Sequence, residues 1–128
     1  MTRFSRILVE RFQNAPYSCS IPDADRVGAA GRSGGGPSMT IYLQLECEDV
    51  INASFRARGC GVTIACGSML AEMLIGRSLS ACRELTIDDL IAALDGIPAD
   101  KRHAPVLAIA ALHDALAADS GPGDGDCD

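Results

Sequence analysis

Aromatic residues and long hydrophobic runs are both scarce in this sequence. Aromatic residues make up 4% of the 128 residues, and tryptophan is absent, so a folded core has to be built from aliphatic side chains. No apolar run approaches the ~18 residues that a transmembrane helix needs. The first residues also lack the long apolar segment of a secretory signal peptide. We therefore expect a cytoplasmic protein with no membrane partner.

Basic charge is scarce as well. The chain has 11 Lys and Arg against 17 Asp and Glu, for a net charge of −6, whereas a nucleic-acid partner calls for a basic face. This length fits one domain with a real core. We place the domain at residues 1–118, because residues 119–128 are rich in Asp and Gly and contain too little apolar surface to fold. We expect these last residues to form a disordered acidic tail.

The six cysteines show neither a Cys-x-x-Cys pair nor the spacing of a disulfide framework. This argues against a zinc ribbon, and a cytosolic protein is expected to keep its thiols reduced. Cys47 falls on the apolar side of an alternating segment, which indicates a core position or a hairpin end. Cys82 stands among polar residues and is interpreted as a surface position.

Hydrophobic periodicity predicts an α+β fold with a small antiparallel sheet of about three strands packed against helices. Apolar and polar residues alternate over 39–47 and 51–58, which is typical of a half-buried hairpin. The breaker-rich region 14–37 reads as a loop with a short edge strand near 26–28. Helical patterns cover 2–13, 63–75 with Thr63 as its N-cap, 78–82, 86–94 with Thr86 as its N-cap, and a last segment that begins near Ala104.

The segment Gly59-Cys60-Gly61 stands where the second hairpin strand ends and the next helix begins. Glycine tolerates the positive φ angles of a sharp turn. A thiol near a helix N-terminus ionises more readily than a free cysteine, because backbone N–H groups and the helix dipole favour an anion there. Cys60 is therefore a candidate metal ligand or nucleophile. The alternative is a buried cysteine that packs as a small apolar residue, and the flanking glycines favour the first interpretation.

Two further residues are candidates for the same site. Cys66 shares an apolar helix face with Leu70 and Met73, which indicates a core thiol, but its place near the helix start would also allow it to join Cys60. His103 lies between Lys101-Arg102 and the last helix, and its spacing alone indicates an exposed loop residue.

These segments, in this order, resemble the iron–sulfur cluster scaffold family of IscU and the NifU N-terminal domain. The resemblance covers roughly residues 3–118. It is carried by Asn14, Asp23-Ala24-Asp25-x-Val27-Gly28, Phe55-x-x-x-Gly59-Cys60-Gly61-x-x-Ile64-Ala65-x-x-Ser68, Gly76-Arg77-Ser78-Leu79 and Lys101-Arg102-His103.

The resemblance implies a site that gathers the glycine loop at 34–37, the Cys60 turn and His103. The family pattern has three cysteines, and here two of them fall on Gly35 and Ala104. Cys60 and His103, with Cys66 as a further candidate, would then bind an iron–sulfur cluster, iron or zinc, or the site would hold no metal. A [2Fe–2S] cluster ordinarily takes four ligands, so this set is short of a full site within one chain.

The resemblance leaves three functions open. One is a divergent scaffold or carrier whose ligand set is completed across a homodimer or by a partner. A second is a metal-free interaction module that binds a cysteine desulfurase or another iron–sulfur assembly protein. The third is a persulfide acceptor that uses the Cys60 thiol alone. An enzyme is not expected, because no Ser-His-Asp order or group of paired carboxylates stands out.

Overall fold

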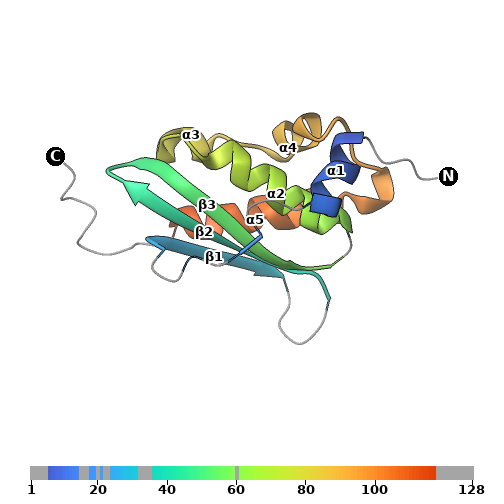
Figure 1. Ribbon diagram of the computed structural model, residues 1–128, viewed down its shortest axis with the longest axis horizontal. Coiled ribbons are helices and arrows are strands. Elements are labelled where there is room, and N and C mark those ends of the chain that lie inside the picture. Colours follow the sequence, from blue (N-terminus) through green and yellow to red (C-terminus); the bar gives the residue numbers. More distant parts are fainter. Residues whose placement is uncertain are drawn as a thin grey trace.

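A three-stranded antiparallel sheet with helices packed against it forms the body of the molecule (Figure 1). The computed structural model describes residues 6–14, 18–19, 21, 24–31, 36–59 and 61–117. Strands β1 (Arg26–Gly31), β2 (Ser38–Glu46) and β3 (Asp49–Arg58) lie in sequence order across the sheet. The predicted α+β class is confirmed.

Strands β2 and β3 form the hairpin that the alternating pattern predicts. The two-residue turn between them is Cys47-Glu48, and Cys47 has a φ of 60°, which a non-glycine residue adopts readily only in turns. A register shift at Gln44/Leu45 interrupts the pairing near this turn. At the other end of the sheet, Gly31, Ser38 and Arg58 stand in one row across the three strands.

In the part of the chain that the structure describes there are five α-helices, α1 to α5, and one short 3-10 helix, η1, which precedes α5. Their bounds are α1 Arg6–Asn14, α2 Gly61–Leu74, α3 Leu79–Arg83, α4 Ile87–Ala93, η1 Ala99–Lys101 and α5 His103–Ala117. Thr86 caps α4 as predicted and forms a reciprocal capping box with Asp89. Ser78, the predicted first residue of the short helix 78–82, is instead the N-cap of α3.

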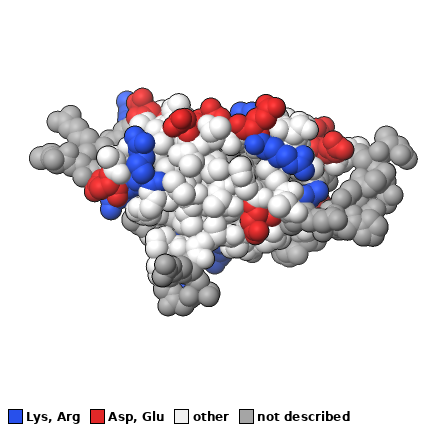
Figure 2. Space-filling model, turned by 180° about the vertical axis from the view of Figure 1, so that it is seen from behind, with Lys and Arg blue, Asp and Glu red and all other residues white. Residues whose placement is uncertain are grey.

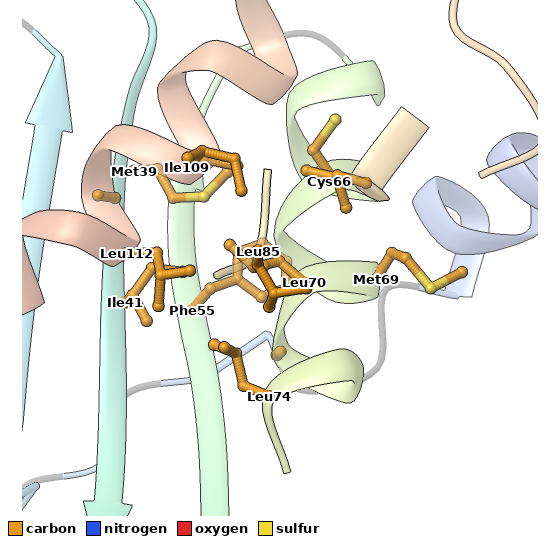
Figure 3. Packing of buried hydrophobic residues seen from close by; sticks show 14 of the residues in the cluster. Met39, Ile41, Phe55, Cys66, Met69, Leu70, Leu74, Leu85, Ile109 and Leu112 are labelled. Atoms are coloured by element: carbon orange, nitrogen blue, oxygen red, sulfur yellow. The ribbon is translucent and has the colours of Figure 1, made fainter. Parts of the chain in front are cut away.

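The core lies between the inner face of the sheet and helices α2 and α5. Among the residues whose burial is described, its side chains are mostly aliphatic, and one aromatic ring joins them: Phe55 of β3 is fully buried among Ile41, Leu70 and Leu112 (Figure 3). Gly67 of α2 makes room for this ring, because a Cβ there would stand 2.4 Å from Phe55 Cδ2. A chain with few aromatic residues therefore places one of them at the centre of its sheet–helix interface.

The backbones of helix α5 and strand β1 are in direct contact, with no side chain between them at Gly28. A Cβ on Gly28 would lie 2.0 Å from the backbone nitrogen of Ala115 and 2.4 Å from the carbonyl oxygen of Ala111. Two hydrogen bonds join the same elements: Arg26 Nη1 donates to the Leu116 carbonyl at 2.8 Å, and the Asp114 carboxylate accepts from the Ala29 N–H at 2.9 Å. These contacts fix the direction of α5 as antiparallel to β1.

Three details of the sequence interpretation are wrong. Helix α2 begins at Gly61 rather than after an N-cap at Thr63, which is fully buried within the helix. Cys82 is fully buried rather than on the surface, because α3 turns it inward together with Leu79, three residues earlier. Cys47 is exposed at the hairpin turn and is disulfide-bonded, whereas reduced thiols were expected.

Charged side chains of both signs stand along the upper border and toward the ends of the face in Figure 2, with uncharged surface between them. Blue and red side chains both occur on the described part of that face, so its charge is mixed rather than basic. Within the described residues, no helix has the combination of length and apolarity that crossing a membrane requires.

Candidate metal and cluster site

The corner between β3 and α2 is formed by glycines on both sides of Cys60. Gly59 has a φ of +149°, a region that favours glycine, and a Cβ on it would lie 2.8 Å from Thr63 Oγ1. Gly61 is the first residue of α2. Cys60 itself lies outside the described residues, so its two glycine neighbours mark the position of the candidate ligand.

The loop that precedes β2 starts and ends beside this corner. Gly31 ends β1, Ser38 begins β2, and both pair in the row that contains Arg58, the last residue of β3. Of the glycine loop at 34–37, Gly36 and Pro37 are described and exposed, while Gly34 and Gly35 lie outside the described residues. The backbone thus brings this loop and the Gly59 turn to one end of the sheet.

His103 is the first residue of α5 and is exposed. Leu116, near the end of α5, contacts Arg26 at the start of β1, and Ala111, earlier in α5, lies against Gly28 two residues later. The first residue of α5 therefore lies toward the Gly31 end of β1. Figure 1 agrees, because α2 and α5 begin at the same end of the molecule, the end where α1 lies. His103 and Gly59 are 44 positions apart in the sequence but share this end.

Cys66 lies in the second turn of α2 and has no exposed surface. In Figure 3 its sulfur atom points toward the N-terminal end of α2, away from Leu70 and Leu74. Its burial fits the interpretation as a core thiol, since cysteine is among the most buried residue types. Its sulfur could reach a ligand only from within the hydrophobic cluster.

The described residues alone do not form a metal site. No three His, Cys, Asp or Glu side chains gather closely enough to hold a metal ion within the part of the chain that the structure describes, which leaves Cys60 out. A metal at this end would need donors beyond those that the described residues bring together, and His103 is an exposed residue at this end.

Three described cysteines remain: Cys82 and Cys47 lie away from this end of the sheet, and Cys19 is exposed. Cys82 is a buried residue of α3, and this burial raises the pKa of its thiol while Arg77 and Arg83 lower it. Cys19 is exposed and free, and Cys47 lies at the hairpin turn at the far end of β3. None of these thiols joins the row of Gly31, Ser38 and Arg58.

The motif Asp25-x-Val27-Gly28 has a structural role. The Asp25 carboxylate accepts a hydrogen bond from the Leu45 N–H at 2.6 Å, and the Asp25 N–H donates to the Leu43 carbonyl at 2.8 Å. Gly28 allows α5 to approach. The motif therefore holds β1 between β2 and α5, and through α5 it sets the position of His103.

Comparison with known proteins follows this geometry. Residues 4–120 match the NifU-like N terminal domain family. The chain belongs to this family. It is similar to the iron–sulfur cluster assembly scaffold protein IscU 1 of Archaeoglobus fulgidus, with 34% identity over 113 residues, which cover 88% of this chain and 74% of that relative.

Solved structures share the fold of this chain. A crystal structure from Fervidobacterium islandicum matches with a TM-score of 0.63 at 16% identity, over 88% of this chain and 96% of its own. The N-terminal part of a NifU-like protein from Brucella abortus matches with a TM-score of 0.54 at 19% identity, over 86% and 77%. At these identities the likeness concerns the fold. The scaffold name of the archaeal relative agrees with the expectation that this NifU-like chain is not an enzyme.

Sequence reasoning missed a polar feature at the opposite end of the molecule. Arg26 is buried there although it belongs to a short strand of small residues, and it shares a cavity with Arg83. The only available signal was an arginine at an inward position of that strand, two residues before Gly28. Residues 119–128, the predicted tail, lie outside the described residues.

Proposed function

We propose that this NifU-like chain takes part in iron–sulfur cluster assembly as a divergent scaffold or carrier. Family membership over residues 4–120 supports the assembly role. One observation supports the proposed site: the Gly59–Gly61 corner and His103, the first residue of α5, lie at the same end of the sheet. In this proposal the iron, zinc or cluster is cargo, and Cys60 and His103 are its ligands.

The two ligands differ in their chemistry. Cys60 directly precedes the first residue of α2, and the dipole at a helix N-terminus favours the thiolate form of a cysteine. An imidazole at His103 can bind iron or zinc when it is neutral. A cluster needs four ligands, and Cys66 is buried, so a second protomer or a partner protein would supply the missing thiolates.

Position 104 favours an alternative function. The family pattern calls for a cysteine after the histidine, but Ala104 is fully buried in the core and offers no donor atom. A metal-free adaptor of the assembly system, or a persulfide acceptor, would need no third ligand. As an acceptor, the Cys60 thiolate would attack the outer sulfur of a cysteine desulfurase persulfide; the desulfurase would keep its cysteine thiol, and Cys60 would carry the transferred sulfur.

Metal analysis after anaerobic purification tests the proposal. We expect iron or zinc bound to the wild type, with visible absorption if a cluster is present, and a loss of metal in Cys60→Ser and His103→Ala. Cys19→Ser removes an exposed free thiol and serves as the matched control that retains metal. The mass in solution, measured with and without metal, shows whether two chains share the cargo.

The opposite outcomes separate the alternatives. If the reconstituted wild type binds no more metal than Cys60→Ser, the carrier proposal is wrong. Intact-mass measurement after incubation with a cysteine desulfurase and cysteine then distinguishes the other two functions. A gain of one sulfur atom that Cys60→Ser abolishes would identify a persulfide acceptor, and a stable complex without sulfur transfer would identify an adaptor.

A further inference from the structure

Two exposed arginines stand at the end of β3 that leads into the Cys60 corner. Arg56 and Arg58 are exposed, whereas Phe55 between them and the start of the strand is buried in the core. Because side chains of a strand alternate between its two faces, both arginines project from the face turned away from the core, about 7 Å apart along the strand. Arg58 is followed directly by Gly59. The two guanidinium groups therefore form a pair of cations next to the candidate cargo site.

Each arginine belongs to a row of paired residues that crosses all three strands, and the other members of both rows are small and uncharged. One row consists of Ala29, Thr40 and Arg56, and the other of Gly31, Ser38 and Arg58. Residues that pair directly across strands project from the same face of the sheet, so the half-buried hydroxyl residues Thr40 and Ser38 stand beside the guanidinium groups. We call these two rows the arginine platform.

No described carboxylate neutralises this pair of cations. Within the part of the chain that the structure describes, neither arginine forms a salt bridge or a side-chain hydrogen bond. The Asp114 carboxylate accepts from the Ala29 N–H at the outer edge of β1, two strands or about 10 Å from β3. Glu46 follows Thr40 by six residues along β2, or about 20 Å. Both distances exceed the screening length of about 8 Å at physiological salt, so the pair favours an anionic partner.

The spacing of the two arginines indicates the shape of that partner. In an extended chain, side chains two residues apart project to the same side and lie about 7 Å apart. Carboxylates at alternate positions of an extended segment therefore match the two guanidinium groups, which bind carboxylates in a bidentate manner. A nucleic acid fits less well, because a long phosphate backbone would also meet Glu46 and Asp49 at the other end of the hairpin, in a chain with a net charge of −6.

We propose that the arginine platform docks an extended acidic segment of a partner protein that carries carboxylates at alternate positions. Arg58 directly precedes Gly59, so the part of the partner that adjoins the docked segment lies beside the Cys60 corner, where cargo is delivered or received. This use of the docking rests on the proposed function, whereas the docking itself needs neither Cys60 nor a metal.

A titration of the isotope-labelled full chain with a synthetic peptide of alternating Gly and Asp, followed by the amide chemical shifts in NMR spectra, tests the docking. We expect saturable shifts concentrated at Ser38, Thr40, Arg56 and Arg58, and none with a peptide of alternating Gly and Asn. Arg56→Gln and Arg58→Gln should each raise the Kd about two- to fivefold, the effect of one exposed ion pair. The difference should shrink at high salt, because exposed charges are screened.

Arg83→Gln is the matched control. It removes the same charge from an exposed residue of α3, which lies beside the hairpin turn because the Leu79 N–H donates to the Glu48 carbonyl at 2.8 Å. This variant should keep the wild-type Kd for the peptide. An equal rise in Kd in Arg83→Gln would show that net charge alone attracts the peptide, and would overturn the proposal. Shifts confined to other residues, or tighter binding of an oligouridylate of equal charge, would overturn it as well.

Cys60→Ser separates this proposal from the proposed function. We expect the peptide to bind Cys60→Ser as it binds the wild type, because the arginine platform is unchanged. A wild type that binds metal but not the peptide would overturn the docking and leave the carrier proposal standing. A wild type that binds the peptide but no metal would support the docking and overturn the carrier proposal.

Discussion

Replacing Gly28 by alanine should disrupt the packing of α5 more than any exposed substitution on β1. The added Cβ would stand 2.0 Å from the Ala115 nitrogen and 2.4 Å from the Ala111 oxygen. Non-bonded heavy atoms come into favourable contact at about 3.5–4.0 Å. The strand and the helix would therefore have to separate by more than ~1 Å along this contact.

The expected cost follows from the atoms involved. Overpacking a rigid core costs about 1–3 kcal/mol and occasionally more, and here the obstacle is backbone that no rotamer change can move. We expect Gly28→Ala to lower the free energy of unfolding by about 3 kcal/mol. For a domain of this size, that corresponds to a fall in Tm of roughly 10 °C or more. Urea and thermal unfolding followed by circular dichroism measure both quantities.

Two comparisons sharpen this prediction. Ala29→Val adds volume on the exposed side of the same strand, where a β-branched residue is favourable, and should change stability by less than ~0.5 kcal/mol. In Gly67→Ala the added Cβ overlaps a side chain instead, the Phe55 ring. Adding Phe55→Leu to this variant should therefore recover part of the stability that Gly67→Ala loses. A Gly28→Ala variant within ~1 kcal/mol of wild type would refute the close approach of β1 and α5.

Three other predictions follow from the structure. Thr86→Ala removes the capping box with Asp89 and should lower the free energy of unfolding by about 1 kcal/mol, as urea unfolding would show. Asp114→Ala removes the carboxylate that accepts from the Ala29 N–H and should lower the free energy of unfolding by about 1 kcal/mol. Hydrogen exchange at the Ala29 amide should become faster. Burial raises the pKa of Cys82, so the unfolded state loses its proton first as pH rises. Above about pH 8.5, stability should fall more steeply in wild type than in Cys82→Ala.

The hairpin was predictable because its pattern is local. Alternation over 39–47 and 51–58 has the period of a strand, and strands β2 and β3 occupy these positions within two residues at each end. The N-cap at Thr86 was predictable for the same reason, since a side chain that accepts from N–H groups two or three residues away needs no tertiary information.

Strand β1 shows where local reasoning falls short. Its sequence, Arg26-Val27-Gly28-Ala29-Ala30-Gly31, has weak strand propensity and predicted only a short edge segment. The strand extends to Gly31 because β2 pairs with it and α5 covers it. Cys82 was wrongly predicted to lie on the surface for a related reason. Its neighbours in the sequence are polar, so the sequence did not show which side of this five-residue helix faces the core.

The candidate site was predictable in its placement but not in its chemistry. The glycines around Cys60 indicated a strand-to-helix corner, and Gly59 and Gly61 confirm it. Bringing His103 to the same end depended on the family resemblance, because its distance along the sequence carries no signal. Ligation by Cys60, His103 or Cys66 stays a prediction.

The hydrogen bond from Ala29 to Asp114 also bears on how a partner protein could recognise this sheet. Exposed edge strands recruit foreign strands through their unpaired backbone groups. Here a carboxylate occupies the outer side of β1, and on β3 isolated bridges join Phe55 to Ser18 and Asp49 to Ser78. Strand addition is thus obstructed at both margins, which also lowers the tendency to aggregate and leaves docking to loops, helix surfaces and side chains on the face of the sheet.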